Sequence, residues 1–166
     1  MKIQYDNLID SCSLSDEQNL AIKATWLSYF KICDKNAWVA WWNYHALSII
    51  VIVLGVFIPI LEGSTIKVEI LGKNFGIVSI LGIIVAIIVG IMSHWKFESR
   101  WKHYRLNAEI IRVEGEDFFA LSNKYSEFEK HSDAYEKFMG IITSFKRKET
   151  KLYIESMDNQ SKTSDD

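Results

Sequence analysis

Two long stretches of the sequence carry no charged side chain, and they constrain the fold more than any other feature. Residues 37–61 and residues 74–95 contain no Asp, Glu, Lys or Arg, although these four types make up 24% of the 166-residue chain. A hydrocarbon core about 30 Å thick is crossed by roughly 20 helical residues, so each stretch is long enough to span a bilayer. Because lipid offers backbone N–H and C=O groups no partner, each stretch is expected to be a helix. The sequence therefore predicts an all-α membrane protein built on a two-helix transmembrane hairpin.

The alternative is a pair of helices buried in a soluble protein. The mean hydropathy of +0.02 is compatible with it, but this average hides how strongly the apolar residues are concentrated. Helices that are apolar on all sides must be covered by other material, and a chain of this size has little left to cover two of them. We therefore expect the lipid bilayer to be the chain's main partner.

Basic residues are distributed unequally about the two stretches. The connecting segment, residues 62–73, holds two lysines and two glutamates. Eight basic residues flank the other ends of the stretches: Lys23, Lys31, Lys35, Lys96, Arg100, Lys102, Arg105 and Arg112. The same ends carry the aromatic residues Trp38, Trp41, Trp42, Tyr44, Trp95 and Trp101. Because basic residues stay cytoplasmic and Trp and Tyr favour the interface, we expect a multi-pass protein of the cell (inner) membrane with both termini cytoplasmic.

The expected divisions of the chain follow from these stretches. They are an N-terminal cytoplasmic helix (1–36), transmembrane helix 1 (37–61), an external loop (62–73), transmembrane helix 2 (74–95), a cytoplasmic helical body (96–155) and a disordered tail (156–166). The first 36 residues are polar and charged, so no cleaved signal peptide is expected and the first span acts as its own insertion signal. Cys12 and Cys33 are expected to remain thiols in a reducing cytosol.

Local patterns refine these divisions. Residues 1–13 look irregular, and Ser13 or Ser15 is expected to cap a helix that enters the first span with little or no break. The connecting segment is expected to form an extended turn around Ile66, Val68 and Ile70. A final helix is expected to start at Asp133 with Glu136 as its capping box.

Beyond the second stretch, large and small residues recur alternately four and three positions apart. These residues are Phe97, Trp101, Tyr104, Ala108, Ile111, Gly115, Phe118, Ser122 and Tyr125. The spacing is that of a heptad seam and predicts an unbroken helix from residue 96 to about 130. Such a helix is roughly 50 Å long and extends the second span into the cytoplasm.

The second span also carries small residues four positions apart, at Gly82, Ala86 and Gly90. Small residues let helix backbones approach closely in lipid. This face packs either against the first span of the same chain or against another subunit, and the sequence leaves both open.

Signals of chemistry are weak. The chain has no Gly-rich phosphate loop, HExxH, CxxC or GxSxG motif. One histidine and four acidic residues could be considered as a metal cluster: His103, Glu109, Glu114, Glu116 and Asp117. The favoured interpretation is that they are solvated charges and intrahelical pairs. We expect no catalytic residue, no metal, no cofactor, no nucleic-acid partner and no enzyme activity.

The basic cluster after the second span has two interpretations. Its members are Lys96, Arg100, Lys102, Arg105 and Arg112. They contact anionic lipid headgroups, or they form a phosphate site for a soluble nucleotide signal assembled between subunits.

One segment resembles a known family. The first span ends in residues 57–61, FIPIL, and the second is followed by a W-x-x-Y-R-x-x-A-E-x-x-x-x-E pattern. Its residues are Trp101, Tyr104, Arg105, Ala108, Glu109 and Glu114. Over about residues 20–150 the chain resembles the SLATT family, the two-transmembrane effector domains associated with nucleotide-signalling and SLOG-type sensor proteins of prokaryotes. The pattern residues themselves favour docking of the cytoplasmic helices, with Arg105 and Glu109 paired within their helix or across to the N-terminal helix.

The resemblance implies an oligomeric membrane effector, pore-forming or membrane-disrupting, in a bacterial antiphage or conflict system. The signal is then supplied by a separately encoded sensor or nucleotide-signal-producing partner. A membrane-anchored scaffold that recruits a cytoplasmic protein without permeabilising the membrane is the alternative.

Overall fold

The computed structural model describes residues 5–63, 66–70 and 73–162. The chain divides into two units. Residues 33–106 form what we call the hairpin unit. Residues 1–32 and 107–166 together form the bundle unit.

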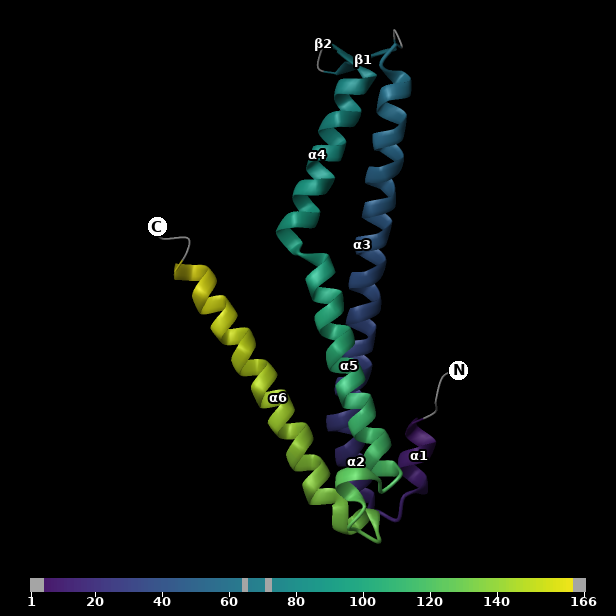
Figure 1. Cartoon of the computed structure of the whole chain (residues 1–166), viewed down its shortest axis with the longest axis vertical. Coiled ribbons are helices and arrows are strands. Elements are labelled where there is room, and N and C mark those ends of the chain that lie inside the picture. The colour runs from purple at the N-terminus through teal and green to yellow at the C-terminus, as the bar shows by residue number, and fades with distance from the viewer. Residues whose placement is uncertain (1–4, 64–65, 71–72, 163–166) are drawn as a thin grey trace. The chain divides into compact units, whose positions relative to one another are not determined.

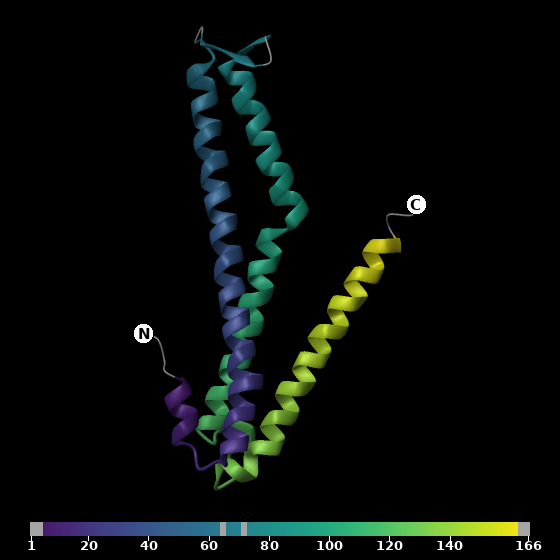
Figure 2. The ribbon, with the colours of Figure 1, turned by 180° about the vertical axis from the view of Figure 1, so that it is seen from behind.

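Two long helices and a small β-hairpin make up most of the hairpin unit (Figure 1). Helix α3 (Ser28–Leu61) and helix α4 (Ile77–Trp95) run side by side in both views (Figure 2). Strands β1 (Lys67–Ile70) and β2 (Lys73–Gly76) connect them, with antiparallel pairing. The expected extended turn is confirmed as β1, whereas the pairing strand β2 was not anticipated.

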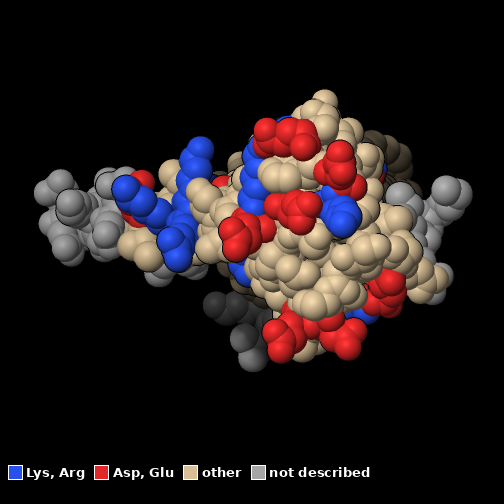
Figure 3. Space-filling model, turned by 90° about the horizontal axis from the view of Figure 1, so that it is seen from below, with Lys and Arg blue, Asp and Glu red and all other residues tan. Residues whose placement is uncertain are grey.

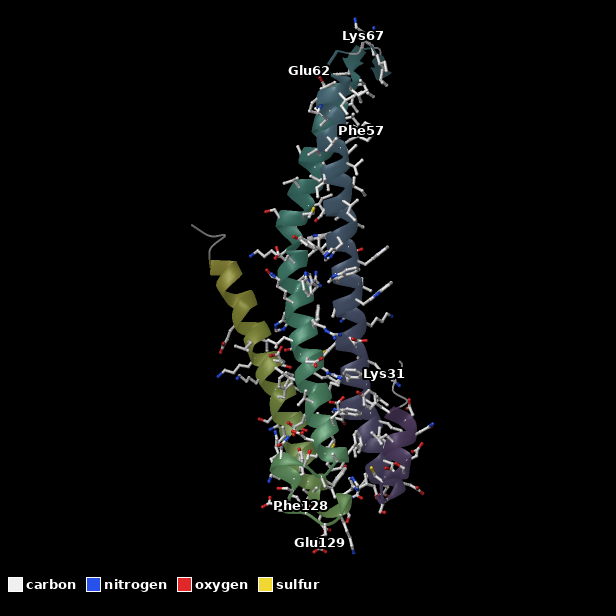
Figure 4. All side chains as sticks on the ribbon, turned by 45° about the vertical axis from the view of Figure 1, so that its right-hand side comes forward. Lys31, Phe57, Glu62, Lys67, Phe128 and Glu129 are labelled. Atoms are coloured by element: carbon white, nitrogen blue, oxygen red, sulfur yellow. The ribbon has the colours of Figure 1, made fainter. Side chains whose placement is uncertain are left out.

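The apolar side chains of α3 and α4 are exposed. In the most apolar 18-residue window of each of the two helical stretches, 0% of the residues are buried. Ile52 and Ile83 leave 65% and 58% of their surfaces uncovered, and Phe57 points away from α3 (Figure 4). This exposure disagrees with a pair of helices buried in a soluble core. Both helices are long and apolar enough to cross a membrane.

Helix α4 ends at a break that the sequence did not predict. Lys96 has φ 47°, in the left-handed region, and its N–H donates to the carbonyl of Met92 at 3.1 Å. This is the five-to-one bond of a left-handed helix cap, a position that glycine usually occupies. The next helix, α5 (Phe97–Phe119), begins immediately afterwards. The expected helix therefore begins close to residue 96, at Phe97, but the prediction that it extends the second span without a break is wrong.

The prediction that this helix runs to about residue 130 is also wrong. Helix α5 stops at Phe119, and Leu121 and Asn123 have φ 45° and 51°. A short 3-10 helix, η2 (Asn123–Tyr125), follows. The chain reverses direction at these positive φ values. Neither residue is a glycine, so the residue types do not predict the turn.

The bundle unit begins with a helix where irregular chain was expected. Helix α1 (Tyr5–Ser11) has only two buried residues, Tyr5 and Ile9, so its periodic pattern is too short to read. Helix α2 (Asp16–Ile22) starts at the expected cap: Ser15 accepts from the N–H of Gln18 at 3.2 Å. A π-helical stretch, η1 (Lys23–Leu27), then leads into α3 without a gap, as predicted.

Helix α6 (His131–Lys162) closes the bundle unit. The N–H groups of Asp133 and Ala134 donate to the carbonyl of Lys130, so the helix starts before the expected capping box at Asp133 and Glu136. Its backbone remains helical to Lys162, which corrects the expected disordered tail from residue 156 as far as residue 162. The remaining residues of that tail, 163–166, lie outside the described chain.

Aromatic rings form the core of the bundle unit. Trp26, Phe118, Tyr125 and Phe138 are each fully buried. The rings of Phe118 and Phe138 stack at 4.3 Å between centroids, and Trp26 meets Phe119 edge-on at 5.3 Å. The core therefore joins η1, α5, η2 and α6 through residues far apart in the sequence.

Candidate functional site

Four members of the heptad seam are buried against other parts of the same chain. In the bundle unit its members Ala108, Ile111, Phe118 and Tyr125 expose 2% or less of their surfaces. Their cover comes from the chain itself, because Trp26, Phe138 and Ile142 belong to the same core. This part of the seam is therefore not free to pair with another subunit. Ser122 is only half-buried.

Trp26 is the residue around which this site is built, and sequence reasoning missed its role. Its indole N–H donates to the carbonyl of Ile111 at 2.8 Å. Its ring lies directly on Gly115, where an added Cβ would stand 2.1 Å from the Cζ2 atom of the indole. Only glycine allows this approach, so the small member of the heptad pattern is a seat for Trp26. The spacing of Gly115 in the seam was the available signal.

The motif residue Glu114 is buried beside Gly115, with 8% of its surface exposed. Its carboxylate accepts from the hydroxyl of Tyr125 at 2.5 Å and from Nζ of Lys124 at 2.6 Å. Both carboxylate oxygens thus have a donor, which a buried charge requires. Burial, and then the Glu114 carboxylate, raise the pKa of Tyr125 far above its usual value. Glu114 therefore ties η2 to α5.

Glu109 and the basic residue Arg112 belong to a second polar group of the bundle unit. The Arg112 guanidinium binds the carboxylate of Glu109 one turn away and that of Glu116 at 3.2 Å. The hydroxyl of Tyr5 donates to Glu116 at 3.5 Å, which connects α1 to α5. Burial, with Glu116 next, raises the pKa of Tyr5.

The other motif residues lie in the hairpin unit. Arg105 pairs with Asp34 of α3 at 3.2 Å, which is one of the two arrangements expected for Arg105, a contact across to the N-terminal helix. Both side chains of the pair are more than half exposed. Trp101 and Tyr104 are half-buried. The indole nitrogen of Trp101 is buried and finds no hydrogen-bond partner among the described residues. The motif is therefore divided between the two units.

The five basic residues are divided between the two units. Arg112 lies in the bundle unit, bound to two carboxylates, and Lys102 pairs with Glu98 at 2.6 Å in the hairpin unit. Lys96 and Arg100 are exposed and form no ion pair with a described residue. These two are the residues that remain available to an anionic headgroup.

The acidic residues of the possible metal cluster accept hydrogen bonds from side chains of the bundle unit. Asp117 accepts from Nδ2 of Asn123 at 2.7 Å and from Ser122 at 3.3 Å, which fixes the turn after α5. Within the described residues, no three His, Cys, Asp or Glu side chains are grouped in a way that could hold a metal ion.

The small-residue face of α4 is uncovered. Gly82, Ala86 and Gly90 are exposed, and an added Cβ at either glycine meets no atom within 4 Å. The face does not pack against α3 of the same chain, which was one of its two interpretations.

The architecture thus defines a class of all-α protein: a helical hairpin with two helices apolar enough to cross a membrane, and an aromatic helical bundle. The chain belongs to the DUF4231 family, described as a protein of unknown function, whose family model matches residues 28–133. The match runs from the first residue of α3 to the first turn of α6. Comparison with curated proteins and with solved structures gives no match.

Proposed function

We propose that the chain is a two-span membrane protein that assembles into an oligomer and permeabilises the bilayer. Both termini lie in the cytoplasm, and the membrane is the cell (inner) membrane. The observation that carries the proposal is the exposure of α3 and α4, whose most apolar windows have no buried residue. Side chains of this kind are stable when lipid or another apolar helix covers them.

The orientation is supported by the contents of the two ends of the hairpin unit. The end with Trp38, Trp42 and Trp95 carries large exposed aromatic rings, as at a membrane interface. Lys96 and Arg100 follow Trp95 in the chain, are exposed, and are free to meet anionic headgroups of the inner leaflet. The β1–β2 end then faces outward.

Assembly through α4 is supported by the open face at Gly82, Ala86 and Gly90. Because α3 leaves this face uncovered, a helix of another copy can approach it closely. The walls of such an assembly are apolar, so conduction requires hydration of a hydrophobic constriction. The proposal gives the chain no catalytic role and no cofactor.

The finer identification is membership of the SLATT effectors. It is supported by the W-x-x-Y-R-x-x-A-E-x-x-x-x-E residues, from Trp101 to Glu114, and by the two apolar helices. On this proposal the chain acts in antiphage or conflict defence, and a separately encoded sensor or nucleotide-signal-producing protein activates it.

Dye release from liposomes that contain the purified full-length chain tests permeabilisation. We expect leakage once the activating partner is supplied, and loss of leakage in Gly82→Leu/Gly90→Leu, because the added side chains keep a second helix away. The matched control is Ile84→Leu/Ile91→Leu on another exposed face of α4, which retains leakage. Absence of leakage and of membrane depolarisation in cells under every activating condition contradicts the proposal.

A membrane-anchored scaffold is the second candidate, and a groove along α6 favours it. This groove is lined by residues of η1 and α6 and has a volume of about 680 Å³. A scaffold leaves the liposomes intact, so the same dye experiment separates the two functions.

A further inference from the structure

The groove along α6 has a basic lining that the core of the bundle unit does not use. It runs between Thr25 of η1 and a face of α6, and it is lined by Thr25, Thr143, Lys146, Arg147, Thr150 and Lys151 together with Ile154 and Glu155. The α6 positions recur three and four residues apart, as one helical face requires. This groove therefore presents three cations along a single hollow.

The cations are only weakly engaged within the chain. Lys146 lies 5.3 Å from the ring of Tyr29, and Lys151 is 3.8 Å from Glu155. Arg147 forms no ion pair with a described residue. Exposed pairs of this kind contribute little, so the three charges remain available to an external anion.

The opposite charge gathers at the other end of α6. The loop between η2 and α6 carries Glu127 and Glu129, followed by Lys130, and the first turns of α6 carry Asp133 and Glu136. The Glu127 carboxylate is paired with Nζ of Lys137 at 2.6 Å, but this pair is exposed and contributes little, so Glu127 can exchange it for another cation. Figure 3 shows acidic side chains over this end of the bundle unit with basic side chains among them, and a further group of basic side chains to one side. Figure 4 shows Glu129 at the tip of the loop, where it is exposed. A projecting acidic element and a basic hollow are thus present on the same unit.

We propose that the basic groove of one copy receives the acidic loop, residues 126–130, of a second copy of this chain. Glu127 and Glu129 of one copy then approach Arg147 and Lys151 of the other. A hollow suits a projecting loop better than a flat bilayer surface does, which favours a second copy over anionic lipid. The contact joins two different faces, so repetition produces a ring if the rotation closes and a filament if it does not.

This contact rests on the proposed oligomer and names one of its interfaces. The test therefore measures association, not leakage. Arg147→Glu/Lys151→Glu reverses the groove, Glu127→Arg/Glu129→Arg reverses the loop, and a third chain carries all four changes. The charge-matched control is Lys35→Glu/Lys148→Glu, which reverses two exposed basic residues that belong neither to the lining of this groove nor to the loop.

We expect each reversed chain to associate at least about tenfold more weakly in neutral detergent, because like charges then face each other. The chain with all four changes regains association, since the attraction is restored with its sign exchanged. Mixing the two reversed chains gives mixed oligomers. Native mass spectrometry and chemical cross-linking report the oligomers, and circular dichroism confirms that every variant is folded.

Three results would overturn the proposal. The first is an unchanged oligomer distribution in both folded, reversed chains. The second is failure of the fourfold variant to recover what the double variants lose. The third is an effect of the reversals that appears only in vesicles with anionic lipid, which assigns the groove to the membrane surface. Leakage that disappears while this association persists counts against the proposed function alone.

Discussion

Trp26 of the bundle unit is fully buried, whereas Trp42 of the hairpin unit leaves 54% of its surface exposed. The same contrast holds for the surrounding helices. No residue of α4 is buried, although it is the more apolar helix, whereas α5 and α6 bury apolar faces and leave their charges outside. In water, an apolar side chain gains about 25 cal/mol for each Å² that it buries. The hairpin unit leaves this apolar surface uncovered, and its two helices are long and apolar enough to cross a membrane.

Polar groups show the same difference. In the bundle unit the buried Glu114 carboxylate has a donor at each oxygen, and the Trp26 N–H reaches the Ile111 carbonyl. In the hairpin unit the ion pairs Lys102–Glu98 and Arg105–Asp34 lie between exposed side chains. Specific tertiary contacts therefore stabilise the bundle unit, and the hairpin unit depends on what surrounds it.

Removal of Trp26 is expected to have the largest effect. Trp26→Ala leaves a cavity on Gly115 and removes the hydrogen bond from the indole to the Ile111 carbonyl, and it lowers the free energy of unfolding by about 3–5 kcal/mol. The control Trp42→Ala changes it by about 0.5 kcal/mol or less, because an exposed ring leaves no cavity. Chemical unfolding of the full-length chain in mild detergent, followed by circular dichroism, measures both. Equal losses would remove the contrast between the units.

A charge placed among the exposed apolar residues separates lipid from water. Ile83→Arg in α4 is expected to make the free energy of membrane insertion less favourable by about 2.5–3.5 kcal/mol. This is the cost of placing an arginine near the centre of a span. Leu152→Arg in α6 is the control, since Leu152 is 49% exposed in the bundle unit and its replacement meets water. The fraction of chain recovered in membranes after expression gives the answer. If Ile83→Arg inserts as well as the native chain, α4 does not face lipid.

Alanine substitutions at the two glycines of the bundle unit are expected to change its stability in opposite directions. Gly115→Ala pushes a methyl group into the Trp26 ring and is expected to destabilise the unit by about 1–3 kcal/mol. Gly140→Ala, where nothing lies within 4 Å, stabilises α6 by up to about 1 kcal/mol through its higher helix propensity. Thermal unfolding of the two variants measures the difference. Two stabilised variants would show that Trp26 does not rest on Gly115.

The sequence predicts the features that depend on local pattern. The two charge-free stretches identify α3 and α4, and the four-three spacing identifies the face of α5 that becomes buried. Ser15, one of the two expected N-caps, is the residue that caps α2. In each case the signal and the structure it predicts lie within a few residues of each other.

The features that the sequence did not predict depend on distant residues or on unusual backbone. Lys96, Leu121 and Asn123 take positive φ without being glycine, so no residue type marks the breaks. The seam predicts a buried face but not its partner, because a buried stripe looks the same whether Trp26 or another chain covers it. Glu114 was recognised in the motif, but its bond to Tyr125 forms only after the turn brings η2 back to α5.

The smallest expected effect concerns Tyr125 at alkaline pH. Burial and the nearby Glu114 carboxylate raise its pKa, so the folded chain keeps the phenol proton at a pH at which the unfolded chain, with a pKa near 10, releases it. The stabilisation is therefore complete below about pH 10 and decreases as the pH rises further, by up to about 1.4 kcal/mol per pH unit.

Tyr125→Phe lowers stability by about 1 kcal/mol at neutral pH, because the hydrogen bond to Glu114 is lost. The gap between the native chain and this variant then narrows above pH 10, while Tyr135→Phe, which removes a half-buried phenol, controls for the loss of a tyrosine. Unfolding curves at pH 7, 10 and 11 measure this gap, and a constant difference would mean that the Tyr125 proton is not held by the folded bundle unit.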